Sequence, residues 1–262
     1  MSAFAKYQGA GNDFIIISHF PNNPAQTAIA LCDRHYGVGA DGLLIATPSL
    51  VADMKMTYLN SDGSSATMCG NGLRCFVQYL YDEHIVNKLE MNIETDAGIL
   101  HGIIQRETNS VTVSLGQPRP LNLNECLSEE TNLVLDIGNR QITVSTIFTS
   151  TVHCVVMIQE NMDIEQLGPM IESHPIFPQR INVNFVKVTS EHSMDVTTYE
   201  RGAGWTKACG SGVMASAILA KQFYPLNNTI RVTTSGGQLE VNTSAFTLRS
   251  NATRIANGEA FL

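Results

Sequence analysis

A tetrapeptide that occurs almost twice constrains this chain more than any other feature: Cys-Gly-Asn-Gly at residues 69–72 and Cys-Gly-Ser-Gly at residues 209–212. Each copy is followed by an apolar run that is compatible with a helix. A cysteine in this position places its thiol, together with free backbone N–H groups, at the positive end of a helix dipole, which binds anions and lowers a thiol pKa. Because the two cysteines are 140 positions apart, the pattern predicts a duplicated fold with two activated thiols.

Length and composition exclude several classes of protein. The 262 residues suffice for two domains, and a composition of 44% hydrophobic and 15% charged residues supplies a core for each half. The net charge is −8 and basic residues do not cluster, so we do not expect nucleic-acid binding, which needs neutralisation of phosphates. No apolar run approaches the ~20 residues that span a bilayer, and the N-terminal residues lack the pattern of a signal peptide. We therefore expect a cytoplasmic protein without a membrane partner, whose six cysteines are reduced thiols.

Short strand-like runs separated by turns dominate both halves, whereas helical periodicity is confined to four segments. The predicted helices cover residues 25–34, 73–83, 164–173 and 213–221. The predicted strands cover 13–18, 54–59, 90–95, 98–105 and 110–115, and then 132–136, 141–148, 153–158, 183–189, 194–199, 229–233, 237–241 and 245–248. The segment Gln-Pro-Arg-Pro that begins at Gln117 interrupts this pattern and is the natural junction between domains. The arrangement predicts an α+β fold that is built twice.

Two thiols of this kind suit the inversion of a stereocentre beside a carboxylate. One group removes a weakly acidic proton from one face while a second group returns a proton to the other face. Cys69 and Cys209 would share one proton and exchange roles when the reaction reverses, and the N–H groups after each cysteine would stabilise the charge that develops on the carboxylate. Either motif alone fits equally well a glycine-rich helix start whose cysteine packs as a small hydrophobe. The matched pair favours the catalytic interpretation.

Six motifs follow one another along nearly the whole chain. They are Gly-Ala-Gly-Asn-Asp-Phe at 9–14, Arg-His-Tyr-Gly-Val-Gly-Ala-Asp-Gly at 34–42, Asn-Ser-Asp-Gly-Ser at 60–64, Met-Cys-Gly-Asn-Gly-Leu-Arg-Cys at 68–75, Arg-Ile-Asn at 180–182 and Glu-Arg-Gly-Ala-Gly-Trp-Thr-Lys-Ala-Cys-Gly-Ser-Gly at 200–212. In this order they resemble the diaminopimelate epimerase family. The resemblance implies an isomerase without cofactor or metal that interconverts LL- and meso-2,6-diaminopimelate in the biosynthesis of lysine and peptidoglycan precursors.

The resemblance also implies an architecture. Family members have two pseudo-symmetric α/β domains, each a twisted strand layer or barrel around a central helix, with the active site between them. Here the domains would cover residues 1–116 and 117–249, and a C-terminal strand at about 250–262 would return to complete the first. A homodimer is an expectation from the resemblance alone.

Carried over position by position, the resemblance assigns roles to individual residues. Cys69 and Cys209 become the acid–base pair, and His153 and Glu200 lie near the thiols as catalytic residues. The implied substrate-binding residues are Asn12, Gly70, Asn71, Gly210 and Ser211 at the reacting end and Asn60, Asn182, Glu200 and Arg201 at the distal amino acid end. An arginine there can bind a carboxylate bidentately, while Glu and Asn oxygens receive an ammonium group.

Several of these residues also fit structural roles. Asn12 and Asn60 are typical of Asx turns, Arg201 of a surface ion pair, and His153 of a core histidine in a strand. Cys75 follows Cys69 at a spacing of six in a helix, so it points in a different direction and belongs to the core. Cys32, Cys126 and Cys154 are likewise expected to be structural.

Three positions depart from the family pattern. Thr151 stands where the family usually has an Asn that contacts the distal end of the substrate, and a hydroxyl replaces only part of an amide's hydrogen bonding. Gly42 replaces a Gln that some members carry, and Trp205 occupies a position that is often acidic or small. These departures leave the proton chemistry intact and bear on the identity of the substrate.

Two alternative functions therefore stay open. One is a racemase or epimerase of the same fold that acts on glutamate, histidine, lysine or a proline derivative. The other is a non-catalytic thiol or metal-binding protein built on Cys69, Cys75, Cys209 and His153. Structural zinc sites favour closely spaced Cys pairs, and this chain has neither that spacing nor a Cys-x-x-Cys redox motif.

Overall fold

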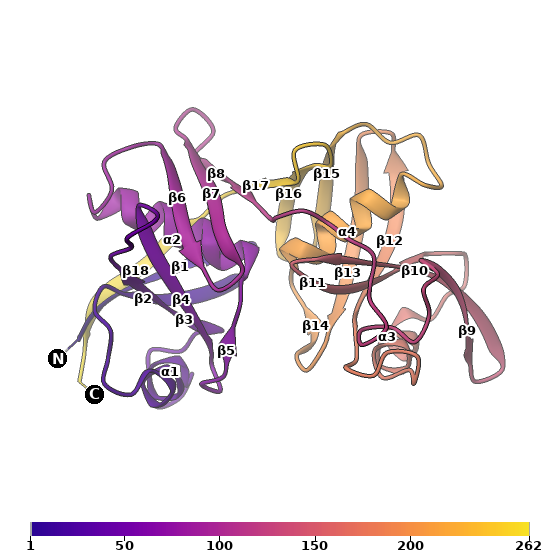
Figure 1. Cartoon of the computed structure of the whole chain (residues 1–262), viewed down its shortest axis with the longest axis horizontal. Helices are drawn as coiled ribbons and strands as arrows, with labels where there is room; N and C mark the ends of the chain where they lie inside the picture. Colours follow the sequence, from indigo (N-terminus) through magenta and orange to yellow (C-terminus); the bar gives the residue numbers. More distant parts are fainter. Residues whose placement is uncertain (1, 262) are drawn as a thin grey trace. The chain divides into compact units, whose positions relative to one another are not determined.

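Two units of the chain each wrap strands around one buried helix (Figure 1). The computed structural model describes residues 2–261. One unit comprises Met1–Ser114 and Arg249–Leu262, and the other comprises Leu115–Leu248. Within the described residues, none of the helices combines the length and apolar character that crossing a membrane requires.

The first unit arranges its strands around helix α2. Its strands pair in the order β18-β1-β2-β3-β4-β6-β7-β8, with β2–β3 and β4–β6 parallel and the other pairs antiparallel. The C-terminal strand β18 lies beside the N-terminal strand β1 (Figure 1). The elements are β1 (Ser2–Gly9), β2 (Asn12–Ile17), α1 (Pro24–Cys32), β3 (Gly42–Thr47), β4 (Met54–Asn60), β5 (Ser65–Ala66), α2 (Gly70–Asp82), β6 (Glu90–Thr95), β7 (Gly98–Gln105), β8 (Ser110–Ser114) and β18 (Thr253–Ala260).

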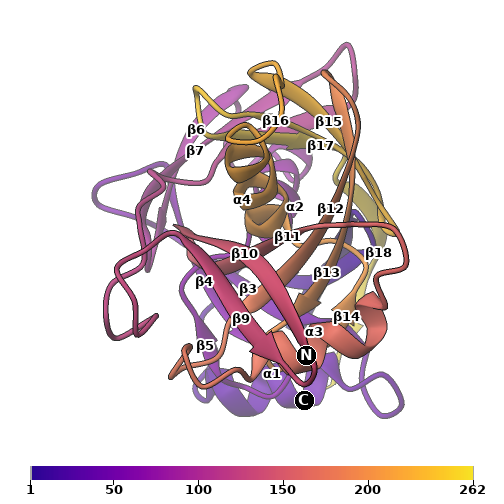
Figure 2. The same ribbon diagram turned by 90° about the vertical axis from the view of Figure 1, so that its right-hand side faces the viewer.

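The second unit repeats this plan around helix α4, which Figure 2 shows with strands β10 to β13 around it. Its strands pair in the order β9-β10-β11-β12-β13-β15-β16, with β11–β12 and β13–β15 parallel. The elements are β9 (Asn132–Ile137), β10 (Arg140–Thr149), β11 (Thr151–Met157), α3 (Ile164–Glu172), β12 (Asn182–Ser190), β13 (Ser193–Glu200), β14 (Gly204–Thr206), α4 (Gly210–Ala220), β15 (Thr229–Thr234) and β16 (Gly237–Asn242); β17 (Thr247–Ser250) then leads back to the first unit.

The strand registers align the two repeats residue by residue. Phe14 in β2 pairs with Gly42 in β3, and His153 in β11 pairs with Asn182 in β12. The same alignment follows through the next strand pair, β3–β4 and β12–β13. It makes the following strand residues counterparts: Asn12 and Thr151, Phe14 and His153, Leu44 and Asn184, Tyr58 and Thr198. The shared N-cap position of Cys69 and Cys209 pairs the helix residues in the same way, Asn71 with Ser211 and Arg74 with Met214.

Both central helices are largely buried, most residues of α2 and of α4 having little contact with solvent. Helix α4 is apolar or small on all sides, as expected for a helix in the interior of a domain. Each helix begins directly after its cysteine: Cys69 and Cys209 are the N-cap residues, both in extended conformation. The first backbone bonds of the helices run from Leu73 N to Cys69 O and from Val213 N to Cys209 O. The N–H groups of the intervening residues therefore have no partner within their own helix.

The structure confirms the four predicted helices and the α+β architecture. Helices α2 and α4 begin three residues earlier than predicted, because the glycines that follow each cysteine form the first turn and carry no apolar signal. The prediction missed β1, β3 and the two short strands β5 and β14. The sequence of β3, Gly-Leu-Leu-Ile-Ala-Thr, is buried along nearly its whole length and shows no alternation, and such a run does not distinguish a strand from a buried helix.

Close packing between β7 and α2 generates a test of the first core. A Cβ atom on Gly102 would lie 2.5 Å from Cγ2 of buried Val77. We expect Gly102→Ala to lower the free energy of unfolding by about 1–3 kcal/mol through overpacking. Val77→Ala removes the obstructing methyl groups, so the double variant should lose clearly less than the sum of the two single losses, as measured by urea unfolding. Additive losses would contradict the contact.

Candidate functional site

In the first unit, the candidate site residues surround Cys69. The Cys69 thiol donates to Oδ1 of Asn12 over 3.7 Å, and Nδ2 of Asn71 donates to the same oxygen over 3.4 Å. Asn12 opens β2 directly after a two-residue turn, in which Ala10 and Gly11 both have positive φ values (54° and 78°). Such a turn matches the twist of the flanking strands. It brings Asn12, from one end of the chain, against the start of α2.

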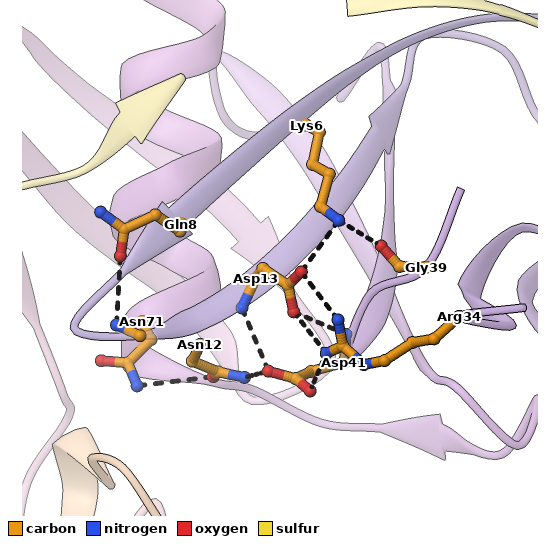
Figure 3. Close-up of polar contacts among 9 residues, drawn as sticks. Lys6, Gln8, Asn12, Asp13, Arg34, Gly39, Asp41 and Asn71 are labelled. Carbon is orange, nitrogen blue, oxygen red and sulfur yellow. Dashed lines mark hydrogen bonds and ion pairs between the residues drawn. The ribbon is translucent and has the colours of Figure 1, made fainter. Parts of the chain in front are cut away.

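A charged network fixes the orientation of the Asn12 amide, as Figure 3 shows. Nδ2 of Asn12 donates to Oδ2 of Asp41 over 2.5 Å. Because a carboxylate only accepts hydrogen bonds, the amide nitrogen must face Asp41 and the amide oxygen must face Cys69. Arg34 binds both Asp41 (2.8 Å) and Asp13 (2.7 Å), and Lys6 pairs with Asp13 at 3.0 Å.

The carboxyl group of Asp13 is tuned by these neighbours. Burial alone raises its pKa, but hydrogen bonds and ion pairs with Arg34 and Lys6 outweigh burial and lower the pKa to about 2. Asp13 therefore holds the network together while it is ionised, and this contribution disappears once it is protonated.

Arg74 is a further residue of the first unit, and its role was not predicted from the sequence. Its side chain is fully buried in α2, between Leu73 and Cys75. It donates to Oδ1 of Asn71 over 2.9 Å and to the Gly70 carbonyl over 3.4 Å, while its Nε has no partner. Within residues 2–261 no carboxylate pairs with it. Burial lowers the pKa of Arg74. A charged residue inside an otherwise apolar helix segment was the available sequence signal.

The remaining first-unit positions lie around the turn between β4 and β5. Nδ2 of Asn60 donates to Oγ of Ser64 over 2.9 Å, so its side chain shapes this turn. Gly42 pairs with Asn60 in the neighbouring strand. A Cβ at Gly42 would lie 2.6 Å from the Tyr58 ring and 2.8 Å from the Leu59 carbonyl oxygen. The glycine is therefore required by the close approach of β3 and β4, and this backbone has no room for a larger residue at position 42.

In the second unit, the candidate site residues surround Cys209. Oγ of Ser211 lies 3.5 Å from the Cys209 sulfur and 2.9 Å from Nε2 of His153. Thr149, at the end of β10, donates to the Ser211 carbonyl over 2.9 Å and so anchors the first turn of α4. The structure thus brings together three residues that the sequence analysis selected from distant segments: Cys209, Ser211 and His153.

His153 is completely buried in β11. Burial, and secondarily the positive charge of Arg201, lower its pKa to about 3. The imidazole is therefore neutral at neutral pH, and it can orient or polarise the Ser211 hydroxyl but does not act there as a cationic acid.

The second unit contains three residues predicted to bind the distal end of the substrate, and each of them makes hydrogen bonds to neighbouring segments of this unit. Asn182 donates from Nδ2 to the Val152 carbonyl over 3.0 Å and accepts from the Arg201 backbone N–H over 2.9 Å. The Arg201 guanidinium donates to the Gln179 carbonyl. Oε1 of Glu200 accepts from Oγ1 of Thr206 over 2.6 Å. Asn182 therefore already spends part of its hydrogen-bonding capacity on holding these segments together.

The two other departures from the family pattern have local explanations. Thr151 is the counterpart of Asn12 in the second repeat, and the one-residue turn before it has Ser150 at φ 66°. Trp205 packs edge-on against Tyr199 at 5.2 Å and lies so close to Gly168 that a Cβ there would come within 2.9 Å of its ring. Trp205 thus fills space between α3 and β13.

The other cysteines behave as core residues. Burial raises the pKa of Cys32 and Cys75 to about 12 and also raises that of Cys126 and Cys154. None of the six cysteines is in a disulfide, and the described part of the chain contains no group of three or more His, Cys, Asp or Glu side chains suited to a metal ion.

The lowered pKa of Asp13 predicts a specific acid sensitivity. The folded value is about 2 and the unfolded value about 3.9, so Asp13 contributes about 2 kcal/mol above pH 4, and this is lost as the pH falls from about 4 to 2. Asp13→Asn should lower stability at pH 7 and flatten the pH dependence of unfolding in that window. Asp96→Asn, in an exposed turn, serves as the control. An acid profile of Asp13→Asn identical to that of wild type would contradict this assignment.

Comparisons with known proteins agree over most of the chain. A model of the family "Diaminopimelate epimerase" matches residues 4–121 and 146–259. The diaminopimelate epimerase of Caldanaerobacter subterraneus is 39% identical over 248 residues, covering 91% of this chain and 90% of the relative. Those of Alkaliphilus metalliredigens and Clostridium perfringens are each 37% identical, covering 91% of this chain and 89% and 91% of the relatives.

Solved structures show the same fold at much lower identity. A PhzF-family protein from Bacillus anthracis matches with a TM-score of 0.71 at 14% identity, covering 100% of this chain and 99% of that one. A probable proline racemase from Agrobacterium radiobacter matches with a TM-score of 0.69 at 14% identity, covering 100% of this chain and 93% of that one. The likeness to these structures shows the fold, and the identity to the relatives goes further: the chain belongs to the diaminopimelate epimerase family.

Proposed function

We propose that this protein is an isomerase that interconverts LL- and meso-2,6-diaminopimelate, with Cys69 and Cys209 as the proton-transferring groups. The observation that carries the proposal is that a chain of this family places a thiol at the N-cap of each of its two buried helices. The proposal places the enzyme in the cytoplasm, where both thiols stay reduced.

The proposed reaction is balanced by proton transfer alone. The thiolate of one cysteine removes the α-proton, and the electron pair of the broken C–H bond moves into the substrate carboxylate. The thiol of the other cysteine then delivers its proton to the opposite face, so thiol and thiolate have exchanged places. The N–H groups at the starts of α2 and α4 stabilise the charge on the carboxylate. No oxidant or cofactor enters the balance.

The distal end of the substrate provides the specificity in this proposal. Diaminopimelate has a second amino acid group, for which Asn60, Asn182, Glu200 and Arg201 supply carboxylate and ammonium partners. Thr151 favours a second candidate, a racemase or epimerase of the same fold with another amino acid substrate, because it replaces an amide that contacts the distal end in the family.

Isotope exchange separates these candidates. Reduced protein is incubated in D₂O with LL-diaminopimelate, and in parallel with glutamate, histidine, lysine and proline, while α-deuterium and chirality are followed. We expect exchange with inversion of diaminopimelate alone. Inversion of one of the other amino acids would identify that amino acid as the substrate and leave the proposed proton transfer unchanged. If none of the amino acids exchanges its α-proton, the result counts against an epimerase.

Replacement of either active thiol should abolish turnover. Cys69→Ser and Cys209→Ser should each reduce epimerisation by at least about a thousandfold, because a serine hydroxyl is far less acidic than a thiol, while the surviving cysteine can still exchange the α-proton from one face. The control is Cys32→Ala, which should keep turnover because its thiol lies in the core. Normal epimerisation by either serine variant would contradict the two-thiol mechanism.

Arg74 offers a test of the surroundings of Cys69. A buried guanidinium favours a nearby thiolate and fixes Asn71. Arg74→Met copies the counterpart residue Met214, so we expect a change in unfolding free energy of less than about 2 kcal/mol, since the lost hydrogen bonds are offset by relief of charge burial. Turnover should fall at least tenfold. If kcat/KM stays at the wild-type value, Arg74 has no part in the activity.

A further inference from the structure

A continuous buried polar chain lies behind Cys209. It runs from Thr198 in β13 through Asn184 in β12 and His153 in β11 to Ser211 at the start of α4. Asn184 and His153 are completely buried, and Thr198 is nearly so. His153 and Ser211 were predicted from the sequence, whereas Asn184 and Thr198 were not.

The hydrogen bonds of Asn184 fix which end of its amide faces His153. Nδ2 lies 3.1 Å from the Cys154 carbonyl oxygen, which can only accept, so this atom is the nitrogen. Oδ1 accepts from Oγ1 of Thr198 over 3.0 Å. The same Nδ2 lies 3.1 Å from Nδ1 of His153. Since the amide nitrogen donates, Nδ1 of His153 must be an acceptor without a proton.

The Asn184 amide thereby determines the tautomer of His153 and, with it, which atom donates in each of the following hydrogen bonds. A neutral imidazole has one N–H, and with Nδ1 accepting, that proton resides on Nε2. Nε2–H then donates to Oγ of Ser211 over 2.9 Å. Because the Ser211 oxygen already accepts this bond, its own proton is available for the Cys209 sulfur at 3.5 Å. A hydroxyl proton directed at a sulfur stabilises the thiolate form.

The first repeat shows that the fold does not require this series of hydrogen-bonded side chains. The counterparts of His153, Asn184 and Thr198 are Phe14, Leu44 and Tyr58, and the Phe14 and Tyr58 rings pack edge-on at 5.9 Å. The same layer can therefore be filled with apolar groups and rings.

The start of α4 also accommodates the amide. A Cβ on Gly212 would collide with Oδ1 of Asn184, whereas its counterpart Gly72 leaves an ordinary 3.4 Å gap to the Phe14 ring. Gly212 thus lets the Asn184 amide come up against the first turn of α4.

We propose that Asn184 is a positioning residue that holds His153 in the Nε2–H tautomer, so that the Ser211 hydroxyl donates its proton to the thiolate of Cys209. The inference rests on the proposed function for its catalytic meaning, but the tautomer and the hydrogen-bond direction are properties of the folded protein in the absence of substrate. Thr198 completes the device by holding the amide oxygen away from His153.

The first experiment reads the tautomer directly. Protein labelled with ¹⁵N-histidine is studied by NMR at pH 7, and His153 is assigned with a His153→Gln variant. We expect a pyridine-like shift for Nδ1 and a pyrrole-like shift for Nε2. Asn184→Asp presents only an acceptor, so Nδ1 should gain a proton and become pyrrole-like. A protonated Nδ1 in the wild-type protein overturns the proposal.

The second experiment measures the effect on the thiol. Asn184→Leu removes the donor to Nδ1, and we expect the rate of Cys209 alkylation by iodoacetamide at pH 7, followed by peptide mapping, to fall about tenfold. Cys69 in the same molecule is the internal reference and should be unaffected. Val186→Ala, at a buried position of the same strand, is the matched control for loss of packing and should leave both rates unchanged.

Two results separate this proposal from the function on which it rests. If Asn184→Leu is poorly folded, Asn184→Asp serves in its place, since it keeps the size of the side chain and removes the donor to Nδ1 of His153. Unchanged Cys209 reactivity in a folded variant overturns the role of Asn184, whatever the enzyme's substrate. Absence of α-proton exchange together with the expected tautomer and reactivity overturns the proposed function and leaves the positioning role standing.

Discussion

The start of a buried helix is the constraint on which the rest of each unit depends. A helix enclosed by its own strands must still satisfy the donors of its first turn, which have no intrahelical partner. In both units the strands leave this end of the helix to polar groups, and the residue at the N-cap is a cysteine that does not cap the helix with its side chain. The candidate residues thus lie where each helix provides no partner of its own for these donors.

The two repeats meet this constraint with different chemistry. In the first, charge dominates: the Asp41–Arg34–Asp13 network orients Asn12, and the buried guanidinium of Arg74 holds Asn71. In the second, neutral groups dominate: His153 is kept uncharged by burial and acts with an amide and hydroxyls. The backbone plan is shared, so the difference between the two thiols' surroundings resides in side chains.

The sequence predicted the elements that carry a periodic apolar pattern and the resemblance that led to the family. It predicted α2 and α4 from residues 73–83 and 213–221, but not their first turns, whose glycines have no side chain to display a pattern. It missed β3 because a strand buried on both faces reads as a continuous apolar run. Arg74 was visible as a charge among apolar neighbours. Its burial was not, because burial depends on the strands that enclose α2.

Asn184 shows most clearly what a sequence leaves out. In the letters Val-Asn-Phe-Val it is a polar residue in a strand, which is equally typical of a solvent-facing position. Only the meeting of β11, β12 and β13 gives it three polar partners, namely His153, the Cys154 carbonyl and Thr198. Only the donor and acceptor count of those partners decides where the proton of His153 resides. Comparison of the two repeats at matching positions could have raised the question, since Leu44 stands where Asn184 does. The role of Asn184 follows only from the register of the strands that surround it.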